Sequence, residues 1–188
     1  MTDNTPVIIF CYRRKIDKLI NSLLKNKEAK ETELFIFSDG YKSEIDKKDV
    51  IDIRESLKKI NGFKLLHIIE SDKNKGLANS IIDGTTEVIN KFGKTIVLED
   101  DLIVSPYFLN FMNKSLRLYQ NKKNIWSVSG YSPVIPKLDN CKNEVYLSLR
   151  SSSWGWATWV DRWKKVDWSI NDFKVLKKNK EKIKSFEQ

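Results

Sequence analysis

Short apolar segments alternate with amphipathic segments through the first hundred residues, and this alternation limits the possible folds more than any other feature. Four segments rich in β-branched and aromatic residues predict buried strands, at residues 7–12, 34–37, 63–69 and 95–98. Three intervening segments repeat apolar side chains with helical spacing, at residues 16–24, 50–60 and 77–89. Such alternation is typical of right-handed crossovers between parallel strands. The sequence therefore predicts an α/β fold, with a mostly parallel, Rossmann-like sheet flanked by helices on both faces.

The second half of the chain has a less regular pattern. Ser105 and Pro106 have the residue types of a helix start, which predicts a helix through Tyr119. Residues 125–129 and 145–149 are predicted strands, and residues 151–163 are rich in tryptophan and serine. The lysine-rich end from Asn171 onward indicates a helix or a frayed tail. No repeat or linker divides the chain, so we expect residues 1–188 to form a single domain.

The composition fits a folded, basic protein. The chain is 40% hydrophobic, which excludes a disordered chain, and its formal net charge is +9. Such charge suits nucleic acid, an anionic membrane surface or acidic ligands such as nucleotide diphosphates. Lysine, asparagine and isoleucine are all frequent, which indicates that a general composition bias accounts for part of the positive charge. No segment reaches the roughly 20 apolar residues of a membrane helix, and no signal peptide is recognisable. We expect a cytoplasmic protein, with peripheral attachment to the inner face of the membrane compatible with its charge.

Cysteine and histidine are too few for a structural zinc site. The chain contains Cys11, Cys141 and His67, and no CxxC pair. Cys11 lies in an apolar segment and is predicted to pack as a small hydrophobic residue. His67 alternates within a predicted strand, which favours a packed core histidine over a catalytic one.

Polar residues follow three of the four predicted strands directly. They are residues 12–14 (Tyr-Arg-Arg), residues 38–40 (Ser-Asp-Gly) and residues 99–101 (Glu-Asp-Asp). Ligands of open parallel sheets bind outside the carboxyl ends of the strands. We therefore expect these three groups to lie together at one edge of the sheet and to form a binding site.

The acidic run Glu99, Asp100 and Asp101 predicts a divalent cation site. Three adjacent carboxylates repel one another and cannot all be buried without a counter-ion. Carboxylate oxygens suit Mg²⁺ and Mn²⁺, which keep several waters and bridge to phosphate groups. Such a cation can stabilise the negative charge of a diphosphate leaving group. A solvated acidic loop is the alternative interpretation of the same three residues.

The acidic run lies in a longer segment, residues 95–109 (TIVLEDDLIVSPYFL), that resembles the metal-site segment of GT-A fold glycosyltransferases. The resemblance is strongest to the N-acetylglucosaminyltransferase I type and to bacterial transferases of surface-polysaccharide synthesis. It extends to residues 11–13, 38–40, 125–131 and 154–156, and so runs over nearly the whole chain.

The resemblance implies specific roles for the matching positions. It implies that Asp101 ligates Mn²⁺ or Mg²⁺, with Asp100 near the ribose and the metal-bound waters. Asp39 would accept a hydrogen bond from the uracil ring, and Arg13 would lie near the phosphates. The implied donor-binding residues are Cys11, Tyr12, Arg13, Asp39, Gly76, Asn79, Glu99 and Asp100, with Gly76 and Asn79 in or next to the loop of residues 74–77. Trp154, Gly155 and Trp156 would line the sugar and acceptor pocket.

Several of these residues have a purely structural alternative. Asp39 suits a turn without any ligand, and Arg13 suits a solvated surface. Trp154 and Trp156 suit a packed core.

The implied activity is transfer of a sugar, for example N-acetylglucosamine, from a UDP-sugar to a glycan or lipid-linked acceptor by an inverting mechanism. Inversion needs a carboxylate base to deprotonate the acceptor hydroxyl. Asp161, Asp167 and Asp172 are the available candidates, and none stands in a convincing motif. We expect that the C-terminal part of the family's domain is missing here, so that the catalytic base and the activity of these 188 residues stay open.

Two other functions remain as alternatives. A sugar-phosphate nucleotidylyltransferase also uses a parallel sheet and a divalent metal, but it needs a glycine-rich loop after its first strand, and residues 11–14 contain no glycine. A nucleic-acid-binding domain would suit the charge. It is disfavoured because the aromatic residues cluster near serine and glycine rather than among the basic residues, so we expect no nucleic-acid partner.

Overall fold

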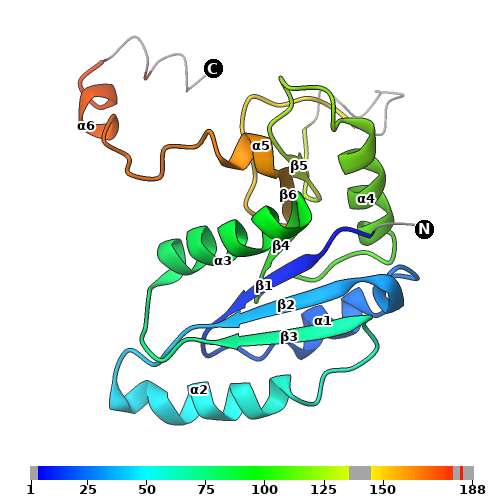
Figure 1. The fold of residues 1–188 in the computed structure, drawn as a ribbon, viewed down its shortest axis with the longest axis vertical. Coiled ribbons are helices and arrows are strands. Elements are labelled where there is room, and N and C mark those ends of the chain that lie inside the picture. The colour runs from blue at the N-terminus through cyan, green and yellow to red at the C-terminus, as the bar shows by residue number, and fades with distance from the viewer. Residues whose placement is uncertain (1–3, 136–144, 180–182, 184–188) are drawn as a thin grey trace.

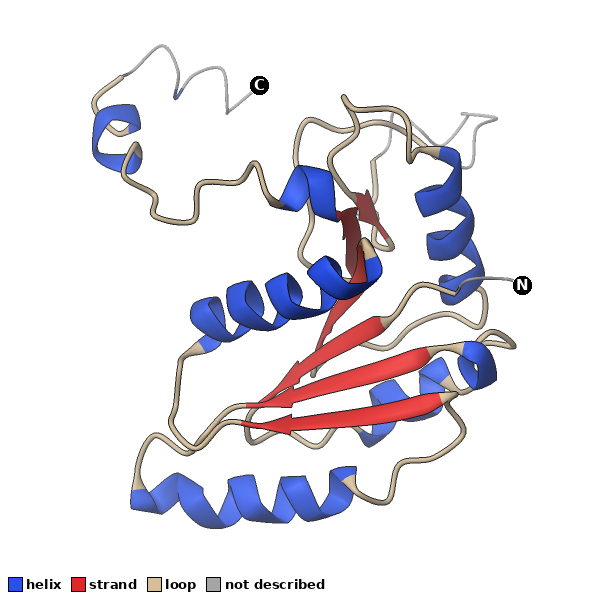
Figure 2. Ribbon diagram, in the orientation of Figure 1, coloured by secondary structure: helices blue, strands red, loops and turns tan. Residues whose placement is uncertain are grey.

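The computed structural model describes residues 4–135, 145–179 and 183, and shows one mixed sheet with helices packed on it (Figures 1 and 2). The strands are β1 (Val7–Cys11), β2 (Glu33–Ser38), β3 (Leu65–Glu70), β4 (Lys94–Glu99), β5 (Val128–Ser129) and β6 (Trp156–Trp159). The helices are α1 (Asp17–Leu23), α2 (Glu44–Leu57), α3 (Leu77–Phe92), α4 (Phe108–Leu118), α5 (Val160–Trp163) and α6 (Phe173–Leu176), with a short 3₁₀ helix η1 (Ala29–Glu31).

The six strands form a single sheet in the order β3-β2-β1-β4-β6-β5. The four strands β1 to β4 are parallel, whereas β6 pairs antiparallel with both β4 and β5. The prediction of a mostly parallel α/β sheet is confirmed. The four strands predicted in the first hundred residues all form, with ends shifted by no more than two residues.

Helices cover both faces of the sheet, as predicted, because apolar side chains alternate along each strand. Ile9, Ile36 and Leu98 point to the face covered by α1, α2 and α4. Phe10 and Val97 point to the opposite face and pack with Val88 of α3.

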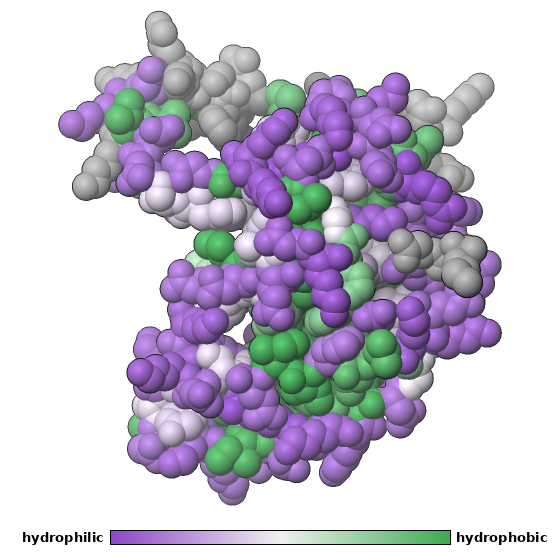
Figure 3. Space-filling model, viewed as in Figure 1, coloured by the Kyte–Doolittle hydropathy of each residue, from purple (hydrophilic) through white to green (hydrophobic). Residues whose placement is uncertain are grey.

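Helix α3 contacts β1 and β4 but leaves part of β2 and β3 open on its own face. Leu65 of β3 is consequently 49% exposed. Figure 3 shows apolar surface in this region between α3 and α2.

The antiparallel direction of β6 decides which of its residues reach the carboxyl edge of β4. Trp159 lies opposite Lys94 at the start of β4, and Trp156 lies opposite Val97 near its end. The residues just before Trp156 therefore reach the edge where the acidic run begins.

Two strand predictions for the second half need correction. Residues 145–149 do not form a strand; Leu147 and Leu149 are 76% and 101% exposed, so nothing buries their apolar side chains. Only Val128–Ser129 of residues 125–129 forms a strand, and β6 arises within the tryptophan-rich segment for which no strand was predicted. The lysine-rich end contains the four-residue helix α6; Cys141 and residues 184–188 lie outside the described residues.

Candidate functional site

The carboxyl edge of the sheet brings together the three polar groups that the sequence singled out. Cys11 lies opposite Ser38, and Phe10 lies opposite Glu99, so residues 12–14, 38–40 and 99–101 leave the sheet side by side. The backbone N–H of Asp39 donates to the carbonyl oxygen of Cys11 at 3.1 Å, which ties the first two groups together. The expected clustering is thus present.

The acidic run is joined to the loop after β1 through Arg14. Its Nη1 lies 2.9 Å from Oδ1 of Asp100 and 2.9 Å from Oδ2 of Asp101. Partial burial raises the pKa of Asp100, while the nearby Arg14 charge acts to lower it. One guanidinium therefore provides the counter-charge that two of the three carboxylates require.

Glu99 is the third carboxylate, and its surroundings disfavour ionisation. Desolvation at the end of β4 raises its pKa, and the charges of Asp101 and Asp100 raise it further. A hydrogen bond with the Ser153 side chain opposes this rise. Since Ser153 precedes β6, the β6 side of the sheet contributes directly to the acidic edge.

The donor set at this edge fits Mg²⁺ or Mn²⁺ in part. Asp100 and Asp101 already share one cationic group, so a divalent cation fits the same oxygens by charge and by ligand chemistry. Within residues 4–135, 145–179 and 183, however, no three histidine, cysteine, aspartate or glutamate side chains gather as a complete ligand set. A cation held here would need water and phosphate oxygens to fill its shell, as Mg²⁺ sites commonly do.

The neighbouring Arg13 points to a different partner from Arg14. Its guanidinium pairs with Asp46 in the first turn of α2. The Tyr12 hydroxyl donates to the same carboxylate at 2.8 Å and accepts from the backbone N–H of Lys42 at 3.0 Å. The hydrogen bond from Tyr12 is the main contact that lowers the pKa of Asp46. In this structure Arg14, which was predicted to lie at this edge but was given no role of its own, contacts the acidic run, whereas Arg13 pairs with Asp46.

Asp39 organises the loop between β3 and α3. Its carboxylate accepts backbone N–H groups from Gly40 and Lys75, both at 2.9 Å, and from Gly76 at 3.0 Å. Gly76 has a φ of +77°, a backbone conformation that favours glycine. The loop-stabilising role considered for Asp39 is therefore present, and a role toward uracil remains a proposal. The side-chain amide of Asn79 donates to the carbonyl oxygen of Lys75 in the same turn.

Arg54 of α2 is a structural residue of this edge that the sequence analysis missed. Its guanidinium donates to the carbonyl oxygens of Ser38 and Asp39 at 3.2 Å and of Ser71 at 2.7 Å. It also bonds the Ser38 hydroxyl and pairs with Glu70 at 3.3 Å. A lone arginine on an amphipathic helix gave no signal of this role, because the acceptors are backbone groups of distant segments.

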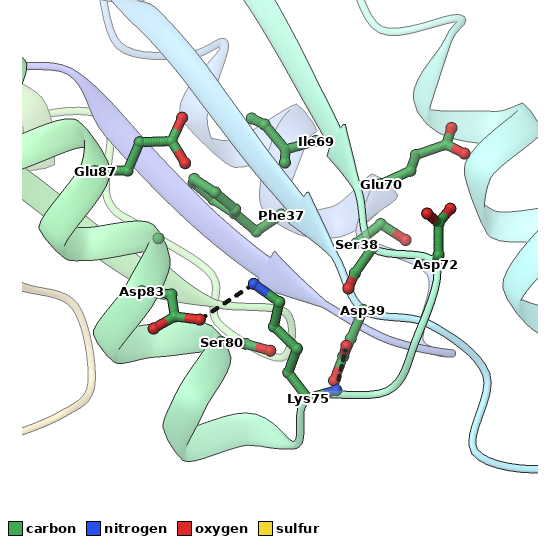
Figure 4. Close-up of a pocket in the computed structure, with 12 residues that line it drawn as sticks. Phe37, Ser38, Asp39, Ile69, Glu70, Asp72, Lys75, Ser80, Asp83 and Glu87 are labelled. Carbon is green, nitrogen blue, oxygen red and sulfur yellow. Dashed lines mark hydrogen bonds and ion pairs between the residues drawn. The ribbon is translucent and has the colours of Figure 1, made fainter.

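A cavity of about 290 Å³, which Asp39 helps to line, lies between the ends of β2 and β3 and helix α3 (Figure 4). Phe37 and Ile69 contribute its apolar surface. Lys75 extends along it to Asp83, with Nζ 3.1 Å from the carboxylate. Neither Arg14 nor the acidic run lines this cavity, so it is separate from the candidate cation site.

The structure separates the two tryptophans assigned to the sugar and acceptor pocket. Trp154 is 53% exposed and stacks at an angle on Tyr131, with ring centroids 4.5 Å apart. Trp156 stacks instead on Trp163 of α5 and packs against the core cluster under α3. Trp156 is thus partly buried against the core, and Trp154 is the more exposed of the two.

Gly155 permits the close approach of β6 to the acidic edge. It has a φ of +72°, and a Cβ there would lie 3.3 Å from side-chain atoms of Leu98 and Phe108. Its carbonyl oxygen accepts the backbone N–H of Gly130 at 2.7 Å. Gly155 therefore contributes to this part of the site through its backbone conformation, which positions the neighbouring Trp154.

Asp161 is not positioned to serve as the base at the acidic run. It follows Trp159, which lies opposite Lys94, so it sits at the amino end of β4, about 16 Å along the strand from Glu99. Ion pairing with Lys123 and Arg162 lowers its pKa to about 2, which makes it a weak proton acceptor.

Asp167 and Asp172, the other two candidates for the base, lie in the segment between α5 and α6. Hydrogen bonds from Ser169 lower the pKa of Asp167. Asp172 is an exposed residue immediately before α6. Of the three predicted aspartates, the strand pairing places only Asp161 away from the acidic run, and a role of Asp167 or Asp172 as the base stays a prediction.

Cys11 and His67 are both packed against neighbouring residues. Cys11 is 4% exposed, and burial raises the pKa of its thiol to about 12, so its contribution to the site is through its backbone. His67 is half-buried on the edge strand, where it stacks on Phe35 at 4.2 Å and lies 3.3 Å from Glu33.

In comparisons with known proteins, no family model matches the chain, and no curated protein is significantly similar to it. Over the described residues, no helix is both long enough and apolar enough to span a membrane.

Proposed function

We propose that this chain is a GT-A type, metal-dependent glycosyltransferase domain that binds a UDP-sugar at the carboxyl edge of its sheet. The observation that carries the proposal is the acidic run at the end of β4, where Asp100 and Asp101 face a shared cationic group. A divalent cation at these oxygens would supply charge stabilisation for a departing diphosphate.

The surrounding residues supply the other features that donor binding needs. Residues 12–14 and 74–76 flank the edge on either side of Asp39, and the loop glycine Gly76 permits close backbone approach. Exposed Trp154 and Tyr131 offer flat apolar faces suited to a sugar ring, on the β6 side next to Glu99. The acceptor would be a glycan or a lipid-linked sugar, approaching over these aromatic rings.

Calorimetric titration of the chain with UDP, with and without Mn²⁺, tests the proposal. We expect UDP binding that depends on Mn²⁺ and that weakens at least about tenfold in Asp101→Ala, because the loss of one carboxylate ligand removes a charged contact to the cation. Asp49→Ala is the matched control, since it removes an exposed carboxylate of α2 that lies outside the acidic run.

Metal-independent UDP binding that Asp101→Ala leaves unchanged would contradict the proposal. Titration with UDP-N-acetylglucosamine against UDP-glucose then identifies the donor sugar. A nucleoside triphosphate that binds more tightly than UDP-sugars would instead favour nucleotidyl transfer.

A further inference from the structure

Two consecutive arginines after β1 point in opposite directions, and their partners differ in kind. Arg13 is held by Asp46 of α2, which also binds the Tyr12 hydroxyl. Arg14 reaches across to β4 and bridges Asp100 and Asp101 through a single nitrogen. The Tyr12 and Arg13 contacts thus anchor the loop, while Arg14 extends from it over the acidic run.

The ion pairs of Arg14 can break without a change in the sheet. Its side chain is 57% exposed, and so is that of Asp101. Its contacts to both aspartates are ion pairs in contact with solvent, which are individually weak. Releasing the guanidinium therefore needs rotation of a long surface side chain and no rearrangement of the sheet.

The charges at this edge do not balance with Arg14 alone. Arg14 contacts two of the three carboxylates of the acidic run, so the run keeps an excess of negative charge. A divalent cation would compensate more of this charge than Arg14 does. Arg14 holds one oxygen of each carboxylate at 2.9 Å, so a cation bound by Asp100 and Asp101 would lie close to the guanidinium, and the two positive charges would repel each other.

We propose that Arg14 is a built-in competitor of the divalent cation, which holds Asp100 and Asp101 until a cation accompanied by a diphosphate displaces it. The proposal rests on the metal-dependent donor binding proposed above. A cation that binds without UDP must displace the guanidinium while offering it no phosphate to pair with. A cation with UDP offers the released guanidinium a phosphate partner, and arginine pairs well with phosphate oxygens.

Arg14 thereby couples the two ligands. Free Mn²⁺ binds weakly, UDP and Mn²⁺ each raise the affinity for the other, and the chain avoids filling its site with cation in the absence of donor. Because such coupling is reciprocal, either ligand can be titrated to measure it.

Titration of Mn²⁺ alone, followed by the electron paramagnetic resonance signal of the free ion, tests the inference. Arg14→Gln is expected to bind Mn²⁺ about 3- to 10-fold more tightly than the unchanged chain, which is the range that two solvent-exposed ion pairs allow. Lys15→Gln is the matched control: it removes the same charge one residue further along, from an exposed lysine, and should change the affinity less than twofold, an effect of about the size of one distant surface charge. Circular dichroism confirms that each variant is folded.

Equal or weaker Mn²⁺ binding by Arg14→Gln would overturn the inference, as would equal tightening by Lys15→Gln, since that would be a general charge effect. The double variant Arg14→Gln/Asp101→Asn should lose the gain, because it removes a carboxylate that the cation would take over. If UDP fails to bind but Arg14→Gln still tightens Mn²⁺ binding, the competition stands and the glycosyltransferase proposal fails. If UDP binds with Mn²⁺ and Arg14→Gln leaves the Mn²⁺ affinity unchanged, the competition alone fails.

Discussion

The carboxyl edge of the sheet has two halves, each organised by an arginine, and the two arginines behave differently. Arg54, at the ends of β2 and β3, is 16% exposed and donates to three backbone carbonyl oxygens and a hydroxyl. Arg14, at the ends of β1 and β4, is 57% exposed and faces carboxylates.

The difference separates an arginine that backbone oxygens hold from one that carboxylates hold. Backbone carbonyl oxygens cannot be satisfied by another ligand without moving the chain, so Arg54 is fixed in place. Carboxylates accept any cation that reaches them, so Arg14 can be replaced. The position of an arginine at a strand end therefore does not show by itself whether the side chain is fixed. The type of oxygen that it contacts does.

The largest effect on this comparison should come from Arg54→Met. The substitution removes a donor from three carbonyl oxygens, of which that of Ser38 keeps the backbone N–H of Ser71. We expect it to lower the free energy of unfolding by about 3 kcal/mol. Urea denaturation measures this loss. Lys58→Met on the same helix removes an exposed ion pair with Glu55 and should leave the urea midpoint nearly unchanged, as should Arg14→Gln. A loss no greater than that of Lys58→Met would remove the distinction between the two halves.

A smaller loss is expected from Gly40→Ala, which tests whether the Arg54 half is rigid. A Cβ at Gly40 would lie 2.5 Å from the carbonyl carbon of Lys73 and 2.8 Å from the backbone nitrogen of Asn74. If Arg54 and Asp39 hold these loops in place, the overlap should cost about 2 kcal/mol of unfolding free energy. Lys42→Ala, at an exposed position nearby, is the control. A cost under roughly 0.5 kcal/mol, small for an overpacked site, would show that the loops move apart freely.

The smallest effect should come from Glu99→Gln in the Arg14 half, and it should be a gain. The pKa of Glu99 is raised in the folded state, so the folded state binds its proton more tightly than the unfolded state does. Ionisation therefore destabilises the fold as the pH rises above the ordinary carboxyl value and through the raised one. We expect Glu99→Gln to be more stable at pH 7, by at most about 0.5 kcal/mol after solvent screening, and not at pH 4.

Thermal unfolding of Glu99→Gln at the two pH values provides the measurement. Glu55→Gln is the opposite control, because its hydrogen bond and ion pair with Lys58 lower the pKa of Glu55. It should bring no gain at pH 7. Equal changes in thermal stability of the two variants would show that ionisation of Glu99 does not destabilise the fold.

The sequence predicted the parallel part of the fold well because its signals are local. Buried strands such as β1 and β4 are continuous apolar runs, and α3 ends at Gly93, which has the left-handed conformation of a helix cap. The pairing of β6 with β4 has no such local signal: Trp156 and Trp159 face opposite sides of the sheet and look alike in the sequence. The strand predicted at residues 145–149 has the right composition but no partner.

For the site, sequence patterns located the edge but not its contacts. The acidic run and Asp39 stand at strand ends, where position alone indicates a shared edge. Which of Arg13 and Arg14 faces Asp100 depends on Asp46, a residue of α2 whose register against the loop is a tertiary property. For the same reason the exposed Trp154 and the packed Trp156 could not be told apart before the direction of β6 was known.

The late position of β6 also affects how the chain emerges from the ribosome. Strands β1 to β4 are complete when Glu99 has been made, but the strand that pairs with the second edge of β4 begins only at Trp156. Until then β4, whose Thr95 to Leu98 are fully buried in the finished fold, presents unpaired backbone groups along an apolar strand. Such an edge is a template for pairing with other chains. A nascent chain halted before Trp156 would therefore be more prone to aggregate than the complete chain, and more dependent on a chaperone during its synthesis.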